Sequence, residues 1–259
     1  GHMPSFLITG TDTGVGKTVV GCGLAAALTA RGKRVGVLKP AETGCPEREG
    51  QLYPQDAALL ARFAQSSLPL EEICPYRFAP PLAPSVAAAM AGTCIEISHI
   101  CAHFQRQVAS HDVMIVEGAG GLLVPLNGRY SFADLAADLQ LPVLVVVGSK
   151  LGALNHALLT FQCAQARSLP LLGYILNHPT PISDLAIQTN AETLAGLTDV
   201  PCLGILPCLS LSGDTAADSA VLSQQFPQAS RAPAVRSRVR FRREPSGAAG
   251  PARASWRRK

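Results

Sequence analysis

The sequence predicts a single α/β domain with a doubly wound, mostly parallel sheet. Short apolar runs that suit strands alternate along the chain with segments of helical periodicity, the order that builds parallel β–α–β units. Nearly all of these runs are apolar on both faces, which is typical of a sheet covered by helices on both sides. A glycine-rich turn joins the first apolar run to the first helical segment. Such a turn is a common start for this class.

The predicted elements follow one another closely. We expect strands at residues 5–9, 35–39, 113–117, 143–147, 171–176 and 202–206, and helices at 17–31, 55–65, 97–110, 154–167 and 183–194. The first helix is the clearest, because Val20, Leu24 and Leu28 recur at helical spacing and Gly32 follows as a stop. Residues 75–84 contain four prolines and predict a rigid surface loop.

The composition fits one sizeable domain. The chain has 259 residues, of which 47% are hydrophobic and 15% charged, enough to cover a buried sheet. No apolar run approaches the roughly 20 residues of a membrane span, so we expect no membrane partner. The eight cysteines contain no Cys-x-x-Cys pair. We therefore expect free thiols in a reducing cytoplasm instead of zinc or disulfides.

The charge is unevenly distributed along the chain. Residues 227–259 contain nine Arg, one Lys and one Glu, whereas the rest of the chain has 12 basic and 17 acidic residues. This Pro/Ala/Ser/Gly-rich stretch has no periodic apolar face and predicts a disordered basic tail. Residues 1–3 resemble a tag remnant, which leaves 4–226 as the domain. A nucleic-acid contact of the tail is possible in principle, but we assign it no function and expect no nucleic-acid partner.

The glycine-rich turn has the composition of a phosphate-binding loop. Residues 10–18 read GTDTGVGKT, between an apolar strand and a helix. In such a turn, backbone N–H groups point at a polyphosphate, Lys17 reaches the outer phosphates, and the Thr18 hydroxyl can bind Mg²⁺. Five residues instead of the standard four separate Gly10 from Gly16. The context nevertheless predicts a P-loop NTPase-like nucleotide site.

Charged residues follow two further strands. In open α/β sheets ligands bind beyond the carboxyl ends of the strands. Lys39 stands there as a second cation suited to phosphoryl transfer, and Glu117 as a second Mg²⁺ anchor. The run Gly118-Ala119-Gly120 after it would let a ligand approach the backbone closely. Asp56 begins a helix, where it is either a metal ligand or a carboxylate favoured by the helix dipole.

Two later strand ends could form a base pocket. Asn177, followed by His178, offers an amide that can read a purine edge, and the run Pro207-Cys208-Leu209 could form the opposite wall. Both segments could equally be ordinary loops. His156 and the other histidines show no metal-ligand spacing.

These motifs occur in an order that resembles the dethiobiotin synthetase family. They are TGTDTGVGKT at 9–18, Lys39-Pro40, VEGAGGLLVPL at 116–126, GSKLGALNH at 148–156, and Asn177. The resemblance covers about residues 5–213. It implies an ATP-dependent ligase in which an amine of 7,8-diaminopelargonic acid captures CO₂ as a carbamate. ATP phosphorylates the carbamate, and the second amine closes the ureido ring with release of phosphate, ADP and dethiobiotin.

The resemblance also implies a role for each matching position. Lys39 and Lys17 would be the catalytic cations. Those implied to bind ATP are Gly14, Val15, Gly16, Lys17, Thr18, Val19, Asp56, Glu117, Gly118, Ala119, Gly120, Asn177, His178, Pro207, Cys208 and Leu209. Of these, Thr18, Asp56 and Glu117 would hold Mg²⁺. Thr13, Thr43 and Gly120 would contact the diamine. Family members are homodimers, and Leu154 and Asn155 would meet the carboxylate of the substrate bound by the partner.

Two positions depart from the family pattern, and two other classes share the phosphate loop. Many family members have Glu at the position of Gly14 and Ser at that of Thr43. Amidases and synthetases that use glutamine need a glutaminase domain, for which the residues after Leu206 leave no room. A partition-type switch ATPase that binds DNA or a membrane is the alternative of a different class. Such ATPases have an extra lysine early in the loop, where this chain has Thr11-Asp12-Thr13.

Overall fold

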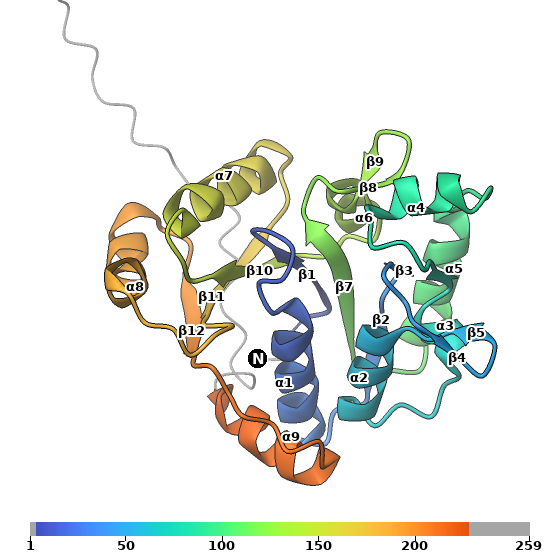
Figure 1. Cartoon of the computed structure of the whole chain (residues 1–259), viewed down its shortest axis with the longest axis horizontal. Coiled ribbons are helices and arrows are strands. Elements are labelled where there is room, and N and C mark those ends of the chain that lie inside the picture. Colours follow the sequence, from blue (N-terminus) through green and yellow to red (C-terminus); the bar gives the residue numbers. More distant parts are fainter. Residues whose placement is uncertain (1–3, 228–259) are drawn as a thin grey trace, which may run out of the picture.

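The predicted parallel sheet is confirmed. The computed structural model describes residues 4–227, so the tag remnant and all but the first residue of the predicted tail lie outside the described residues. Six parallel strands lie in the order β12-β11-β10-β1-β7-β2 (Figure 1). Their bounds are β1 (Phe6–Gly10), β2 (Val35–Leu38), β7 (Val113–Gly121), β10 (Val143–Gly148), β11 (Leu171–Asn177) and β12 (Cys202–Leu206).

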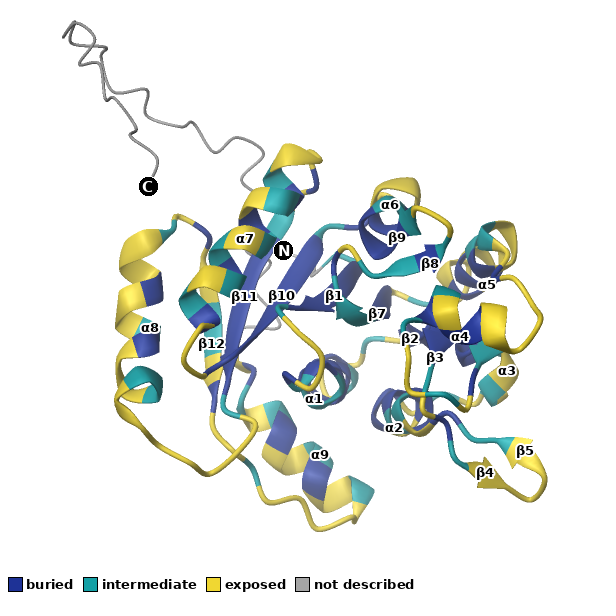
Figure 2. Ribbon diagram, turned by 45° about the horizontal axis from the view of Figure 1, so that its top comes forward, coloured by how far each residue is buried: buried dark blue, intermediate teal, exposed yellow. Residues whose placement is uncertain are grey.

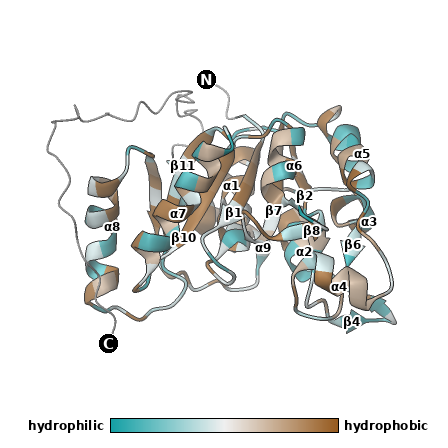
Figure 3. Cartoon of the chain, turned by 90° about the horizontal axis from the view of Figure 1, so that it is seen from above, coloured by the Kyte–Doolittle hydropathy of each residue, from teal (hydrophilic) through white to brown (hydrophobic). Residues whose placement is uncertain are grey.

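Helices cover both faces of this sheet. One face packs against α1 (Lys17–Thr29), α2 (Gln55–Phe63) and α9 (Thr215–Gln224). The other packs against α4 (Pro84–Met90), α5 (Ile97–Val108), α6 (Phe132–Asp138) and α7 (Ala153–Ala166), and α8 (Leu185–Leu197) lies beside α7. In Figure 3 the central strands are mostly hydrophobic, and hydrophilic residues lie on peripheral helices such as α5 and α8. The fold is therefore three-layered.

Alternation along the strands explains why both faces are apolar. In β1, Leu7 belongs to the core cluster on the α7 side, whereas Phe6 and Ile8 belong to the cluster on the α1 side. In β10, Val145 belongs to the cluster on the α7 side and Val146 to the cluster on the α1 side. Figure 2 shows the central strands and most of α1 as buried. A continuous apolar run is thus the sequence signature of a strand with two covered faces.

Several elements differ from the prediction. Strand β7 does not end at Glu117 but continues to Gly121, because Gly10 pairs with Gly121 after a register shift. Helices α6 and α9 were not predicted, although Ser131 and Asp134 form a capping box at α6. Pro84, the end of the predicted loop, is the first residue of α4, a position that proline favours.

The remaining elements are short. Helix α3 is Leu70–Ile73, and the small strands are β3 (Ala41–Glu42), β4 (Glu47–Arg48), β5 (Gln51–Leu52), β6 (Tyr76–Arg77), β8 (Pro125–Asn127) and β9 (Tyr130–Ser131). The eight cysteines are free thiols in the structure. Within residues 4–227, no helix has the length and apolarity needed to cross a membrane.

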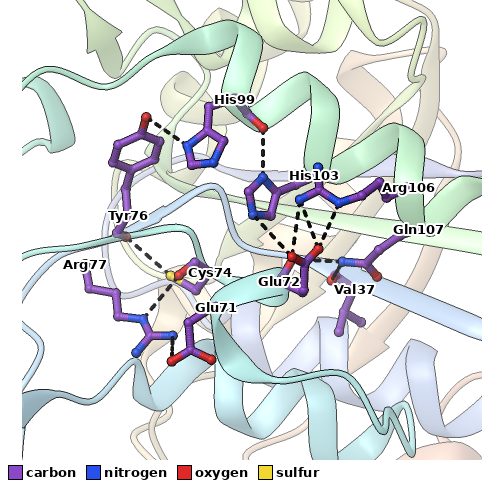
Figure 4. Close-up of polar contacts among 10 residues, drawn as sticks. All are labelled: Val37, Glu71, Glu72, Cys74, Tyr76, Arg77, His99, His103, Arg106 and Gln107. Atoms are coloured by element: carbon purple, nitrogen blue, oxygen red, sulfur yellow. Dashed lines mark hydrogen bonds and ion pairs between the residues drawn. The ribbon is translucent and has the colours of Figure 1, made fainter.

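A polar network between α3 and α5 braces the end of β2 (Figure 4). The Gln107 amide donates to the backbone carbonyls of Val37 at 2.9 Å and Glu72 at 3.2 Å. The Arg106 guanidinium forms an ion pair with Glu72 at 3.1 Å. The carbonyl of Ile73 then accepts a hydrogen bond from the backbone N–H of Lys39 at 2.8 Å. The network therefore fixes the backbone from which the Lys39 side chain projects.

Candidate active site

A cleft of about 730 Å³ lies at the carboxyl edge of the sheet. Its lining includes twelve predicted site residues: Thr13, Gly14, Gly16, Lys17, Thr18, Val19, Lys39, Thr43, Asp56, Glu117, Ala119 and Gly120. Sequence reasoning missed six others, which are Glu42, Pro81, Leu82, Ala83, Pro84 and Val124. Pro81 to Pro84 lead into α4, so the proline-rich segment forms a wall of the cleft.

The glycine-rich turn has the backbone of a phosphate loop. Gly14 and Gly16 adopt left-handed φ angles of 75° and 95°, which favour glycine. Gly16 is the N-cap of α1, and its lack of a side-chain cap leaves the first N–H groups of the helix available to an anion. A Cβ on Gly10 would lie 2.7 Å from Cγ2 of Val15. The turn therefore has no room for a side chain at Gly10.

The Lys39 ammonium lies at the centre of the charged groups in the cleft. Its Nζ donates to Glu117 Oε1 at 3.0 Å and to the Gly118 carbonyl at 3.4 Å, and it pairs with Asp56 Oδ2 at 3.3 Å. The side chains of Lys39 and Glu117 are 4% and 1% exposed, whereas that of Asp56 is 44% exposed. Of the three N–H donors of the ammonium, two therefore form hydrogen bonds, with Glu117 and Gly118, and Asp56 adds an ion pair.

The two lysines of the cleft have opposite pKa shifts. Burial opposes the charged form of Lys39, but the carboxylates of Glu117, Asp56 and Glu42 outweigh it, and the pKa of Lys39 is raised. Burial and the nearby Lys39 charge lower the pKa of Lys17. Lys39 is therefore a fixed cation and not a proton acceptor. An anion bound beside Lys17 would stabilise its charged form, since a nearby negative charge opposes both the burial and the repulsion from Lys39 that lower its pKa.

Glu117, Thr18 and Asp56 form an oxygen donor set beside the phosphate loop. The Thr18 hydroxyl donates to Glu117 Oε1 at 2.7 Å, and Glu117 Oε2 is buried without a hydrogen-bond partner among the described residues. No group of three or more His, Cys, Asp or Glu that could hold a metal occurs within residues 4–227. Two carboxylates and a hydroxyl nevertheless fit Mg²⁺, which prefers few protein oxygens together with substrate phosphates. The spare acceptor capacity of Glu117 is consistent with this fit.

Glu42 is the charged residue that the sequence reasoning missed. It is 5% exposed and lines the cleft. Its carboxylate accepts hydrogen bonds from the backbone N–H groups of Asp56 at 3.1 Å and Ala57 at 2.9 Å. Burial raises the pKa of Glu42, although Lys39 and these N–H groups oppose the rise. Glu42 follows Lys39 by three residues, but nothing in this stretch of sequence indicates a contact with the helix that begins at Gln55.

Asn177 supports the phosphate loop directly. Its side-chain amide is buried and donates to the carbonyl of Val15 at 2.7 Å. A Cβ on Gly16 would collide with this amide, so Gly16 is needed for the contact. Asn177 and Val15, like Gly118, do not line the cleft. This hydrogen bond uses one of the two N–H groups of the amide. The contact of Asn177 with a purine stays a prediction.

The other predicted residues lie outside this cleft. His178 is half-buried, Pro207 and Cys208 are exposed, and Leu209 is half-buried, beyond the ends of β11 and β12. The His178 N–H donates to the Leu206 carbonyl at 2.9 Å, which brings the two strand ends together. Leu154 and Asn155 lie in the first turn of α7, after the exposed Leu151.

Comparison with known proteins identifies the family. A family model described as "AAA domain" matches residues 5–216. The ATP-dependent dethiobiotin synthetase BioD of Thermodesulfovibrio yellowstonii is 39% identical over 83% of this chain and 94% of its own length. That of Anaeromyxobacter dehalogenans is 44% identical over 79% and 90%, respectively. The chain belongs to the dethiobiotin synthetase family. The dethiobiotin synthetase BioD of Bacillus subtilis is likewise 39% identical over 80% of this chain and 89% of its own length.

The solved structures show the fold of this dethiobiotin synthetase family member but not its activity. The MinC:MinD complex of Aquifex aeolicus matches with a TM-score of 0.53 and 15% identity, over 88% of this chain and 94% of the other. A ParA family ATPase of Chlorobium tepidum matches with a TM-score of 0.50 and 14% identity, over 86% and 96%. These similarities confirm the P-loop NTPase-like fold. A shared fold does not by itself favour the partition-type alternative, because the identity to these ATPases is 14 to 15%.

Proposed function

We propose that the protein is an ATP-dependent dethiobiotin synthetase. It carboxylates 7,8-diaminopelargonic acid with CO₂ and closes the ureido ring through a carbamic–phosphoric anhydride, giving dethiobiotin, ADP and phosphate. Besides the family membership, the position of Lys39 supports this proposal. Its ammonium lies between Glu117 and Asp56 in the cleft that the Gly-Lys-Thr turn also lines. A cation in this place is suited to the negative charge that gathers during phosphoryl transfer.

The reaction needs charge stabilisation at two places. A carbamate is a poor electrophile, and its attack on the γ-phosphate of ATP brings two anions together. Lys17, whose pKa is lowered by burial and by Lys39, would contact the outer phosphates. Lys39 would lie between the carbamate and the transferred phosphoryl group, and it stays charged because the carboxylates raise its pKa. Thr13 and Thr43 line the same cleft and could bind the diamine or its carbamate.

Mg²⁺ would be held by Thr18, Asp56 and Glu117. When bound, the ion neutralises charge on the ATP phosphates. Thr18 and Glu117 already share a hydrogen bond of 2.7 Å, so their oxygens start close together. The half-exposed carboxylate of Asp56 completes the donor set from the first turn of α2.

The proposed adenine site lies outside the cleft, on half-buried and exposed residues. We infer that the base lies beyond Asn177, against His178 and the segment from Pro207 to Leu209. Asn177 would then connect the base to the phosphates, because its amide donates to Val15 within the phosphate loop.

Substrate dependence tests the activity. Phosphate release and dethiobiotin formation are measured with ATP and Mg²⁺, with and without diaminopelargonate and bicarbonate. A synthetase needs both co-substrates, whereas a switch ATPase releases phosphate without them. Lys39→Ala should abolish dethiobiotin formation and leave ATP binding, measured by calorimetry, largely intact. Near-normal turnover of Lys39→Ala would remove Lys39 from the mechanism.

We also propose a homodimer in which the segment from Leu151 to Asn155 completes the partner's site. This segment leads into α7, and Leu151 and Leu185 are 84% and 80% exposed, so both apolar side chains are accessible to a second subunit. A mixture of Lys39→Ala with Asn155→Ala subunits tests the shared site. Exchange of subunits should restore about a quarter of the wild-type sites, by the statistics of random C₂ pairing. No recovery in a mixture that does exchange subunits would exclude a shared site.

A further inference from the structure

The carboxylate of Glu42 lies at the start of helix α2 although it comes from a distant part of the chain. Glu42 ends the short strand β3, which pairs in parallel with β6. Its two oxygens accept from consecutive backbone N–H groups, Oε2 from Asp56 at 3.1 Å and Oε1 from Ala57 at 2.9 Å. The backbone of Glu42 is itself fixed, because its carbonyl accepts from Phe78 at 2.9 Å.

Helix α2 lacks a cap of its own. Its N-cap residue is Pro54, which has no side chain able to accept a hydrogen bond. The N–H groups of Asp56 and Ala57 are the second and third of the helix, the two that an N-cap side chain normally satisfies. Glu42 therefore replaces the missing local cap. A carboxylate at this end of a helix is also favoured by the helix dipole.

The position of this cap links it to the charged groups of the cleft. Asp56 donates its backbone N–H to Glu42 and places its side chain 3.3 Å from the Lys39 ammonium. Pro40 and Ala41 alone separate Glu42 from Lys39, which in turn contacts Glu117. One carboxylate thus fixes the helix start that carries Asp56 and adds to the negative charge around Lys39. The first effect sets the position of Asp56, and the second favours the charged form of Lys39, with which Asp56 and Glu117 pair.

We propose that Glu42 is a positioning residue for Mg²⁺ binding: it caps α2 and thereby holds Asp56 in place beside Thr18 and Glu117. This role rests on the proposed function, in which Asp56 is a Mg²⁺ ligand. Outer residues that orient metal ligands commonly change metal affinity or activity by about 10- to 100-fold when they are replaced.

Four variants of the 259-residue chain test the role. Glu42→Gln keeps the length of the side chain but replaces one acceptor oxygen with a donor that faces a backbone N–H. Pro54→Ser supplies a local hydroxyl acceptor for the same N–H groups and is made alone and together with Glu42→Gln. Glu47→Gln is the matched control, because Glu47 is an exposed carboxylate five positions along the chain.

Three measurements are made on each variant. They are the Mg²⁺ concentration that gives half-maximal dethiobiotin synthesis, the affinity for Mg²⁺ of protein mixed with ATP but no diamine, measured by calorimetry, and the thermal unfolding temperature. Glu42→Gln should raise the half-saturating Mg²⁺ concentration and weaken the calorimetric affinity by about tenfold or more. Adding Pro54→Ser should recover most of this loss, and Glu47→Gln should match the wild type.

Two results would overturn the proposal. In the first, folded Glu42→Gln protein binds Mg²⁺ like the wild type and merely unfolds at a lower temperature. In the second, Pro54→Ser restores the unfolding temperature but not the Mg²⁺ affinity, so the charge of Glu42 and not its cap is what matters. If Glu42→Gln does not fold, Glu42→Asp serves instead, since its shorter side chain can reach one N–H group. Failure of the proposed function would instead appear as no dethiobiotin from the wild type, while calorimetry still reports on Glu42.

Discussion

The buried pair between Lys39 and Glu117 allows a quantitative prediction. The two charged atoms are 3.0 Å apart, and both side chains are almost completely buried. At that distance and an effective dielectric constant near 20, the attraction between unit charges is about 5.5 kcal/mol. Replacement of Lys39 by Met removes this attraction but also the cost of burying the ammonium. The remaining Glu117 carboxylate, 1% exposed, is left without its cation.

We therefore expect Lys39→Met to lower the free energy of unfolding by about 3 to 5 kcal/mol in the absence of Mg²⁺. Glu117→Gln should also lower the free energy of unfolding, because it leaves the buried Lys39 ammonium with one carboxylate fewer. The double variant carries neither charge and should cost clearly less than the sum of the two single variants. The coupling free energy of this cycle should be about 2 to 3 kcal/mol.

Urea denaturation in the presence of EDTA, followed by circular dichroism, measures these free energies. Coincidence with the transition followed by tyrosine fluorescence checks that unfolding is two-state. The matched control is the pair of Arg34 with Asp112, which has the same 3.0 Å separation but lies on the surface. Water and salt screen that pair, so its cycle should show no resolvable coupling. A coupling below about 1 kcal/mol for Lys39 and Glu117 would refute the reasoning from burial.

Three further predictions follow from the same geometry. Glu117→Gln should raise the Mg²⁺ concentration needed for activity, and an unchanged Mg²⁺ titration would mean that this carboxylate is structural. The pKa of Lys17 is lowered from its usual 10.5, so the affinity for ATP should be full at neutral pH and fall as the pH rises through this lowered pKa. Calorimetry at a series of pH values measures this loss, which Lys17→Arg should not show. Gly23→Ala should destabilise the domain by about 1 to 3 kcal/mol, because its Cβ would collide with the ring of Phe226. Thermal unfolding of Gly23→Ala alone and with Phe226→Leu checks this, and equal losses in both would contradict a steric cause.

Much of the site could be predicted from the sequence because its residues lie next to strand ends. A lysine or carboxylate that follows an apolar run must emerge at the carboxyl edge of a parallel sheet, where ligands bind. Lys39, directly after β2, lies in the cleft with the Gly-Lys-Thr turn as this argument predicts. Glu117 lines the cleft too, although its strand continues to Gly121. The motif itself fixes the local backbone, since glycines at 14 and 16 permit the left-handed angles of the phosphate loop.

What only the tertiary structure decided are the contacts between segments far apart in the chain. Glu42 gave no local signal, because the N–H groups that it caps belong to a helix that begins 13 residues later. Asn177 was expected to face a base, and the fold also brings it against Val15, 162 positions away, where one of its two amide N–H groups is used within the protein. Periodicity and motifs report on neighbours along the chain, and they determined the strands, the phosphate loop and the family. Which carboxylate caps which helix, and which carbonyl accepts from which amide, depend on packing that arises when the sheet and its helices assemble.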